Sequence, residues 1–500
     1  MSYGHPGVYL TETLLPAPIS VGASANAAGA VVASFAQGPE AVTLVTSWYD
    51  FTNKFGGFNA LFPATFQVGS FFNNGGKELY VKRVLHSDAV DATVNIVTSG
   101  AAVVATVTAK NAGADGNTLR ASLTAGTVSG TWTLGIYKEG TPDALATDLL
   151  LEQYQNINFD TPASSSFAET VINTISSYVK ISASASGTPV VAVYPLTTGA
   201  DGTTPVAADY TSYKSTGASV FEGLSVANRP LVIFLPEVNL LASATTIYAA
   251  ADTWAAAHSG FVVAETPAAD TVATAVTYAG TLTASSTTAV YFPHIFVSDT
   301  LSRSSGAVRL IGPSGGVAGL YLRTDTTAGQ GVAKAPAGIT ATLSDAVAAE
   351  LSFSSADLDT MNSSATPVNP IRYIPGVGLA VMGARTLLQD GTANKYVNMR
   401  RSLIYIEKSL KNKTEFAIFQ NNDQNLWSQI NTVISVFLNE YRNQGGLRGA
   451  SNAQAFWVKC DAENNTAATI ANGQVNIQIG VSLQYPAEFI VINLSQITLA

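Results

Sequence analysis

Hydrophobic residues recur at helical spacing in two segments near the C-terminal end of the chain. In the first segment, Met399, Leu403, Ile406 and Leu410 lie three or four residues apart, and Asn412 stands where a residue tolerant of left-handed backbone commonly ends a helix. The second segment runs from about residue 422 to residue 443. Its apolar stripe consists of Leu426, Ile430, Val433, Phe437 and Tyr441. Asn421 or Asn422 is the expected N-cap and Gly445 follows the end, so the pattern predicts two consecutive amphipathic helices.

Beyond these helices the period changes to two. Apolar and polar residues alternate from Val475 to Leu483, which predicts a strand with one buried face. The last apolar run, residues 489–494, is hydrophobic on both faces and lies close to the chain end. Such a segment is either an ordinary central strand of its own sheet or a strand that adds to the sheet edge of another subunit.

Residues 21–87 and 210–390 have the pattern of an α/β domain. Apolar strands are expected at 30–33, 79–84, 229–236, 260–264, 290–297 and 308–311. Helices are expected at 47–55, 66–72, 242–258, 271–282 and 317–323. Because strands alternate with helices, the strands before residue 88 should pair with later ones in a mixed sheet that contains parallel pairs.

Residues 88–209 differ in character from the segments on either side. Ala, Ser, Thr and Gly dominate, and short alternating patterns occur at 93–97, 103–108 and 132–137, which predicts an inserted β-rich domain. Linker-like stretches are expected at 184–189, 197–205 and 354–370.

Composition narrows the range of functions. Only 12% of the 500 residues are charged, and the mean hydropathy is +0.22, which favours extensive contact between subunits. The net charge of −9 argues against a general nucleic-acid binder. Cys460 is the single cysteine, so no intrachain disulfide is expected, and neither a secretion signal nor a membrane-spanning run of about 20 apolar residues is recognised.

The strongest enzyme-like signal is the sequence GPSGG at 312–316, which matches the nucleophile elbow of α/β-hydrolases at Ser314. That fold requires a histidine after the serine, whereas His5, His86, His258 and His294 all precede it. A tight glycine-rich turn is therefore the favoured interpretation, and a serine hydrolase using Ser314 is a distant alternative. No phosphate-binding loop or metal-ligand spacing is found, so no catalytic residue, cofactor or metal is expected.

Positive charge is concentrated between residues 395 and 413. Six of the 25 basic residues lie there, namely Lys395, Arg400, Arg401, Lys408, Lys411 and Lys413. Three interpretations remain open: a solvated helix face, a patch that faces an acidic protein surface, and a nucleic-acid site.

Several motifs resemble those of contractile phage tail sheath proteins. In the C-terminal half they are VNPIR at 368–372, GARTL at 383–387, YVNMRR at 396–401 and YPAEF at 485–489. Earlier in the chain they are PGVYLTE at 6–12, VTSW at 45–48 with FGG at 55–57, the Pro-Ser pair at 313–314 and KAPAG at 334–338. TAKN at 108–111 and GNTLR at 116–120 resemble a motif of the family's β insertion more weakly.

The resemblance implies a multidomain fold of mixed α/β and α+β class. Its expected parts are an N-terminal arm at 1–20, a discontinuous α/β core at 21–87 and 210–390, the β-rich insertion at 88–209, an inner α+β domain at 391–486 near the tube, and a C-terminal arm at 487–500. Both arms would donate strands to neighbouring subunits, through Val8, Tyr9 and Leu10 at one end and Phe489, Ile490, Val491 and Ile492 at the other.

In function, the resemblance implies a non-enzymatic subunit that assembles with itself into a helical sheath, with stacked hexameric rings, around a tail tube. Contraction from a metastable extended state would drive the tube through the host envelope during genome delivery. Further expected partners are the baseplate and tail terminator proteins, with the basic residues as a possible tube-facing patch. The protein would belong to the virion tail and assemble in the host cytoplasm, and the sheath of a bacterial contractile injection or bacteriocin-like particle is the alternative.

Overall fold

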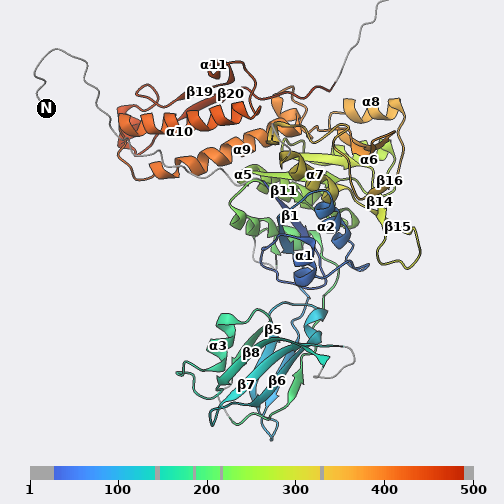
Figure 1. Cartoon of the computed structure of the whole chain (residues 1–500), viewed down its shortest axis with the longest axis vertical. Helices are drawn as coiled ribbons and strands as arrows, with labels where there is room; N and C mark the ends of the chain where they lie inside the picture. Colours follow the sequence, from blue (N-terminus) through green and yellow to red (C-terminus); the bar gives the residue numbers. More distant parts are fainter. Residues whose placement is uncertain (1–26, 141–146, 184–186, 214–217, 327–330, 489–500) are drawn as a thin grey trace, which may run out of the picture.

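The computed structural model describes residues 27–140, 147–183, 187–213, 218–326 and 331–488. The predicted strand-exchange residues Val8, Tyr9, Leu10 and 489–492 lie outside these residues. Figure 1 shows a β-rich domain at one end of the long axis, an α/β domain in the middle, and long helices lying across the other end.

The central domain is built on an eight-stranded mixed sheet. Its strands in spatial order are β18 (Gly378–Val381), β17 (Val368–Ile374), β13 (Thr288–Phe292), β12 (Gly260–Glu265), β11 (Leu231–Phe234), β1 (Ala28–Ala33), β3 (Leu79–Arg83) and β2 (Thr43–Val45). The six inner strands run parallel, and β18 and β2 are antiparallel edges. Since β1 pairs with β11, strands on both sides of the insertion share one sheet, as the sequence predicts.

Helices cover both faces of this sheet. Successive strand residues point to opposite sides, and apolar residues occupy both, so each face needs a covering layer. In β1, Val31 and Ala33 pack toward one layer, whereas Ala30 and Val32 pack toward the other. The first layer contains α1 (Trp48–Phe55), α2 (Ala64–Asn73) and α7 (Ser314–Thr326). The second contains α4 (Ala207–Thr211), η4 (Val220–Ala227), α5 (Ala244–His258), α6 (Val272–Thr281) and α8 (Ser355–Ser363). A three-stranded sheet of β15 (Val308–Ile311), β14 (Ile295–Ser298) and β16 (Ala346–Ala349) lies beside the core.

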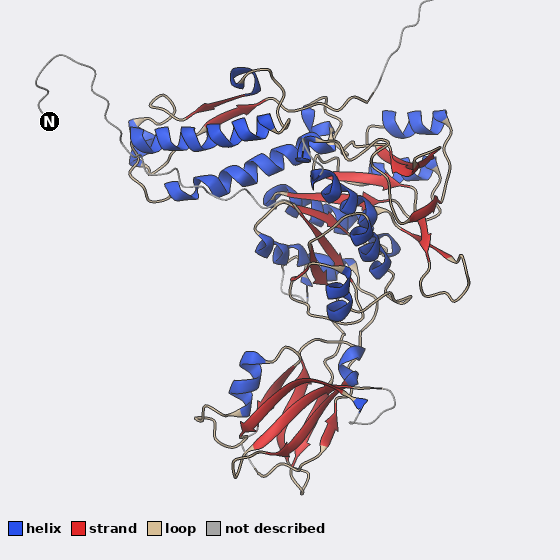
Figure 2. Cartoon of the chain, in the orientation of Figure 1, coloured by secondary structure: helices blue, strands red, loops and turns tan. Residues whose placement is uncertain are grey.

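The β-rich part of the chain consists of two antiparallel sheets around a separate hydrophobic cluster. One contains β4 (Thr93–Val97), β5 (Val103–Ala109) and β9 (Val179–Ala183). The other contains β10 (Val193–Pro195), β6 (Leu119–Ala125), β7 (Trp132–Lys138) and β8 (Leu149–Ile157), and α3 (Ala168–Ile175) packs on the same cluster. Figure 2 shows these strands as a compact body below the core.

The C-terminal part begins with the two predicted helices, α9 (Val397–Thr414) and α10 (Gln424–Asn443). Two strands follow, β19 (Phe456–Lys459) and β20 (Gln478–Val481), with the short helices α11 (Asn452–Ala455) and α12 (Ala467–Ala471) before and between them. Apolar side chains of α9, α10, β19 and β20 share one cluster. The mixed α/β fold class is thus confirmed, and the exact domain boundaries remain predictions.

Five local predictions are wrong. The expected linker 354–370 contains α8, which Ser354 and Asp357 cap reciprocally. Helix α9 continues past Asn412 to Thr414, and the N-cap of α10 is Asp423. The strand expected at 475–483 extends only from Gln478 to Val481. The segment predicted as one strand at 290–297 forms β13 and β14, which belong to different sheets.

Candidate functional site

The side chain of Asn369 in β17 holds the loop after β18 at Arg385. Its amide nitrogen donates to the carbonyl oxygens of Val290 (3.0 Å) and Arg385 (2.8 Å), and its amide oxygen accepts from the Arg385 N–H (2.8 Å). Asn369 is only 2% exposed. Both backbone polar groups of Arg385 are therefore held by a rigid, buried partner, which orients the arginine side chain.

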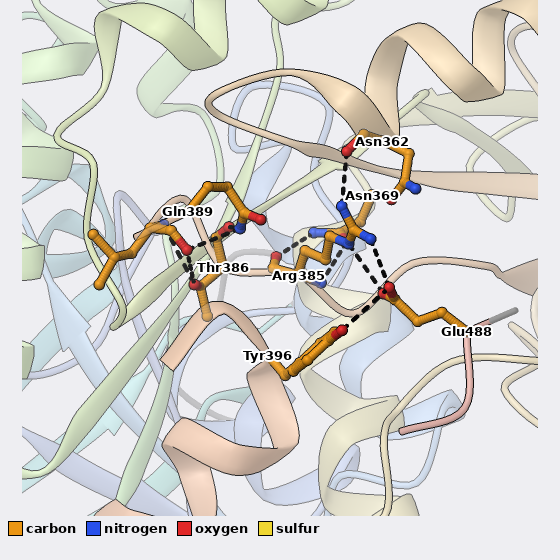
Figure 3. A network of polar contacts seen from close by, with 8 residues as sticks. Asn362, Asn369, Arg385, Thr386, Gln389, Tyr396 and Glu488 are labelled. Atoms are coloured by element: carbon orange, nitrogen blue, oxygen red, sulfur yellow. Dashed lines mark hydrogen bonds and ion pairs between the residues drawn. The ribbon is translucent and has the colours of Figure 1, made fainter. Parts of the chain in front are cut away.

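The guanidinium of Arg385 in turn holds Glu488. Its Nε and Nη2 donate to Glu488 Oε1 (3.0 Å) and Oε2 (2.6 Å), and its Nη1 donates to the carbonyl oxygen of Asn362 (2.8 Å). Tyr396 lies 3.5 Å from the same carboxylate through its hydroxyl group. Figure 3 shows these side chains converging from three separate stretches of the chain. The hydrogen bonds that Arg385 donates to Glu488 raise the pKa of Arg385, as expected for a bidentate pair.

Asn369, Arg385, Tyr396 and Glu488 together are called the arm-root clasp below. Glu488 is the last residue that the structure describes. Its side chain is 22% exposed and that of Arg385 14%, so the ion pair is partly shielded from water. The clasp consequently fixes the position of Glu488 against the core.

A two-stranded sheet lies next to the clasp. Strands β19 and β20 are four residues each and pair from Phe456 opposite Val481 to Lys459 opposite Gln478. Within the described residues the sheet has no third strand. A cavity of about 420 Å³ lies against it, lined among others by Met399, Phe456, Trp457, Leu483 and Tyr485. Trp457 is 54% exposed, and Tyr485 packs edge-on against Tyr396 of the clasp.

The sequence motifs contain every member of the clasp but do not show that they meet. Arg385 and Glu488 are 103 positions apart, and only the fold brings them together. The available signal was chemical: an arginine and a glutamate each stand inside an otherwise uncharged motif, GARTL and YPAEF. In a chain with few charges, such a pair is a candidate for mutual neutralisation.

One member of the predicted basic patch is not on the surface. Arg401 is 4% exposed and its Nη1 and Nη2 donate to the Asp325 carboxylate at 3.0 and 2.5 Å. The guanidinium also lies 4.8 Å from the centre of the Tyr321 ring. Arg401 therefore joins α9 to α7 inside the molecule and cannot face a tube, which corrects its assignment to the patch.

The other five residues point in different directions. Lys395 and Lys413 lie over the rings of Tyr396 and Phe437, near opposite ends of α9. The alkyl stems of such lysines cover apolar surface while the ammonium group stays at the edge. These two lysines do not share a face with the remaining three.

Arg400, Lys408 and Lys411 lie along the other side of α9. Arg400 pairs with Glu407 at 3.7 Å, and Lys408 donates to the side-chain oxygen of Asn228 in the core at 2.7 Å. Lys411 is exposed. The linear run of positive charge is thus divided by the helix into separate surfaces, and whether any of them faces a tube stays a prediction.

Ser314 is fully buried at the start of α7. Its hydroxyl donates to Gln67 Oε1 at 2.7 Å, and its N–H donates to Glu265 Oε2 at 3.0 Å. His294 is engaged elsewhere, with Nε2 2.9 Å from the carbonyl oxygen of Thr266. A Cβ on the adjacent Gly315 would lie 2.2 Å from the carbonyl oxygen of Gln67, so the glycines allow α7 to approach α2 closely. Among the described residues Ser314 has no histidine base, and it has no solvent access, both of which a serine hydrolase needs.

No group of three metal-ligating side chains occurs in the described part of the chain. In the same residues, none of the helices is both long enough and apolar enough to cross a bilayer.

Comparison with known proteins identifies the C-terminal region. The family of the phage tail sheath C-terminal domain matches residues 389–497. The tail sheath protein of Vibrio phage KVP40 is 25% identical over 126 residues, which are 25% of this chain and 18% of that protein. The match therefore spans about a fifth of the curated relative.

Two solved structures share the fold over nearly the whole chain. The anti-feeding prophage (AFP) helical sheath in its contracted state has a TM-score of 0.58 and 20% identity, covering 99% of this chain and 100% of that one. The PVC sheath complex of an extracellular contractile injection system, also contracted, has a TM-score of 0.57 and 20% identity, covering 99% and 98%. The resemblance stated from the sequence motifs is confirmed.

Proposed function

We propose that this chain, a contractile tail sheath protein, is the repeating subunit of a helical sheath whose copies are joined by strands donated from the chain ends. The observation that carries the proposal is the small sheet β19–β20 beside the arm-root clasp. The sheath is expected to surround a tail tube and to meet a baseplate and a terminator, and genome delivery is the expected role in a phage.

The small sheet has the properties of an acceptor. A two-stranded sheet of four-residue strands is marginally stable by itself in water and gains from additional strands. Neither β19 nor β20 has a partner on its outer edge among the described residues. An open edge next to exposed apolar side chains such as Trp457 is a template for β-strand addition.

The chain beyond the clasp has the properties of a donor. Phe489-Ile490-Val491-Ile492 is apolar and rich in β-branched residues, and residues 489–500 could span about 40 Å if fully extended. That reach allows the segment to leave its own subunit. Donation in one direction makes a head-to-tail contact, and contacts of this kind that do not close generate helical assemblies.

The clasp gives the donor a defined origin. If Arg385 and Glu488 hold the root of the arm, the segment points toward one neighbour rather than sampling many directions, and less conformational entropy is lost on pairing. The tether would then keep subunits connected while the lattice rearranges between two packings. A difference of a few kcal/mol per subunit, summed over many copies, drives such a change without a fuel molecule.

Negative-stain electron microscopy of the concentrated full-length protein tests the proposal. Hollow tubes or stacked rings of uniform diameter are expected. Dispersed particles alone, with or without added tube protein, would refute self-assembly.

Deletion of residues 489–500 tests the donor. The shortened protein should melt at the same temperature as the full chain, because a donated strand packs on a neighbouring subunit rather than on its own, yet it should form no tubes. An unfolded or aggregated product would instead show that this strand completes the sheet of its own subunit.

Arg385→Met tests the clasp, with Arg303→Met as a matched control because Arg303 is exposed. The clasp variant should form fewer or irregular tubes while the control forms normal ones. Equal assembly of the two variants would remove the clasp from the mechanism.

A contractile injection particle is a second candidate for the parent assembly. It is favoured by the nearly complete structural coverage of the extracellular injection sheath. The genes next to this one would discriminate between the two particles, since a phage requires capsid and packaging proteins.

A further inference from the structure

A crevice between α9 and the core combines several positive groups. Its volume is about 340 Å³, and it lies where the C-terminal half of α9 passes the end of α5 and the residues that follow η4. Lys408 and Lys411 line it from α9, and Arg229 and His258 line it from the core. The sequence pattern shows the two lysines but gives no indication that Arg229 and His258 join them.

These charges are incompletely balanced within the chain. Glu407 is the one carboxylate that lines the crevice, and it is paired with Arg400 at 3.7 Å. Arg229 pairs with Glu78, whereas Lys408 donates to the neutral side chain of Asn228. In the described residues neither Lys408 nor Lys411 forms an ion pair. Burial lowers the pKa of Lys408, the charge of Lys411 lowers it further, and the nearby Glu415 opposes both effects.

Two buried donors of the lining have no acceptor. Trp254 is 4% exposed and its Nε1 has no hydrogen-bond partner among the described residues, and the same holds for Nε of Arg229. A buried donor without a partner costs roughly 1–3 kcal/mol, so structures normally supply an acceptor. The unpaired groups around this crevice are hydrogen-bond donors or cations, so an anion is the class of ligand that they favour.

We propose that the crevice binds an oxyanion of the carboxylate or phosphate class. Lys408 and Lys411 supply charge from one wall, and Arg229, His258 and Trp254 line the other. In an assembly of copies that each carry a net charge of −9, a carboxylate side chain of a second copy has this chemistry. That source rests on the proposed function, whereas binding of a free phosphate does not.

Calorimetric titration of the unassembled protein with inorganic phosphate tests the site directly. The double variant Lys408→Met with Lys411→Met should bind phosphate at least tenfold more weakly than the wild type. The control, Lys395→Met with Lys413→Met, removes the same charge from the same region outside the crevice and should bind as the wild type does. The single variant Lys411→Met, in which an exposed side chain is changed, guards against misfolding and should also weaken binding. Absence of phosphate binding by the wild type, or equal binding by all variants, would overturn the proposal.

Assembly in phosphate-free buffer distinguishes the two sources of the anion. If a carboxylate of a second copy fills the crevice, the Lys408/Lys411 variant should lose tubes and added phosphate should inhibit assembly of the wild type. If the ligand is a free anion, the variant should assemble normally while still failing to bind phosphate. Failure of the wild type to assemble would contradict the proposed sheath function. It would leave the anion site untouched, because the phosphate titration tests that site independently.

Discussion

Replacing Asp325 by Asn tests whether a single buried ion pair fastens the C-terminal helices to the core. Asp325 lies in the last turn of α7 and Arg401 lies in α9, and both side chains are only 4% exposed. The pair is bidentate, with N–O distances of 3.0 and 2.5 Å. Few other polar contacts of α9 with the core are as deeply shielded, so the variant removes the most protected electrostatic link between these parts.

The expected loss follows from the burial. An asparagine leaves the guanidinium of Arg401 buried without a counter-charge and turns an amide N–H₂ toward it, for which a destabilisation of about 3–5 kcal/mol is typical. The Tyr321 ring 4.8 Å away returns only a part of this loss. Replacing both partners by apolar residues, Asp325→Leu with Arg401→Met, removes the desolvation cost as well and should cost far less than the single change.

Hydrogen exchange followed by mass spectrometry measures the effect locally. Amides of α9 in the Asp325→Asn variant should exchange 10²–10³ times faster, the factor that corresponds to about 3–4 kcal/mol, while amides in the β-rich domain should be unchanged. The double apolar variant should be close to the wild type. If single and double variants exchange equally fast, packing rather than the ion pair holds α9, and the reasoning is refuted.

Three further perturbations have expected outcomes. Burial raises the pKa of Glu237 to about 7, so the folded state retains a proton that the unfolded state releases above about 4.5, and stability should fall as pH rises between these values. Glu237→Gln should abolish this slope and gain up to about 3 kcal/mol at pH 8 in urea unfolding. The hydrogen bond to Asp209 raises the pKa of His86, so their contact should stabilise below pH 6.5 and weaken as pH rises through the raised value. An NMR titration of His86 checks the shift, and a value at or below 6.5 would contradict it. Arg83→Met removes hydrogen bonds to four backbone carbonyls at the junction with the β-rich domain and should lower stability by about 3 kcal/mol or more, whereas an unchanged melting temperature would show that the carbonyls find water.

Regular elements were predictable wherever one physical requirement governed a whole segment. The strand 260–264 and the helix 422–443 follow from the burial of continuous apolar faces, and both lie within two residues of the structure. Helix α8 was missed because its residues are mostly polar and its signal is a cap rather than a stripe. Ser354 accepts from the Asp357 N–H while Asp357 accepts from the Ser354 N–H. This capping box is visible in the sequence, and it starts a helix in a segment whose polar composition predicts a linker.

The C-terminal strand was overpredicted for a related reason. Alternation continues through Val475 and Ile477, but the backbone there is bonded to a side chain rather than to a strand. Asn465 Oδ1 accepts from the Asn476 N–H at 2.6 Å, and its amide nitrogen donates to the Asn476 carbonyl oxygen at 3.1 Å. An alternating pattern indicates which side chains face a core, but it does not indicate which group forms hydrogen bonds with the backbone. Because Asn465 bonds the backbone of Asn476, the strand begins only at Gln478.

The contacts between the parts of the chain, unlike the helices and strands, depend on residues that are distant in sequence. Three arginines take part in them: Arg83 at the junction with the β-rich domain, Arg401 between α9 and α7, and Arg385, which holds Glu488. Each is largely buried, and each is satisfied by groups distant in sequence, so no local pattern could assign the partner. Because only 12% of the residues are charged, an arginine within an apolar motif is nonetheless informative: it must either stay exposed or find a fixed acceptor. Linear clustering, which singled out Arg401 as a surface charge, is the weaker guide, since a helix separates neighbours in sequence onto different faces.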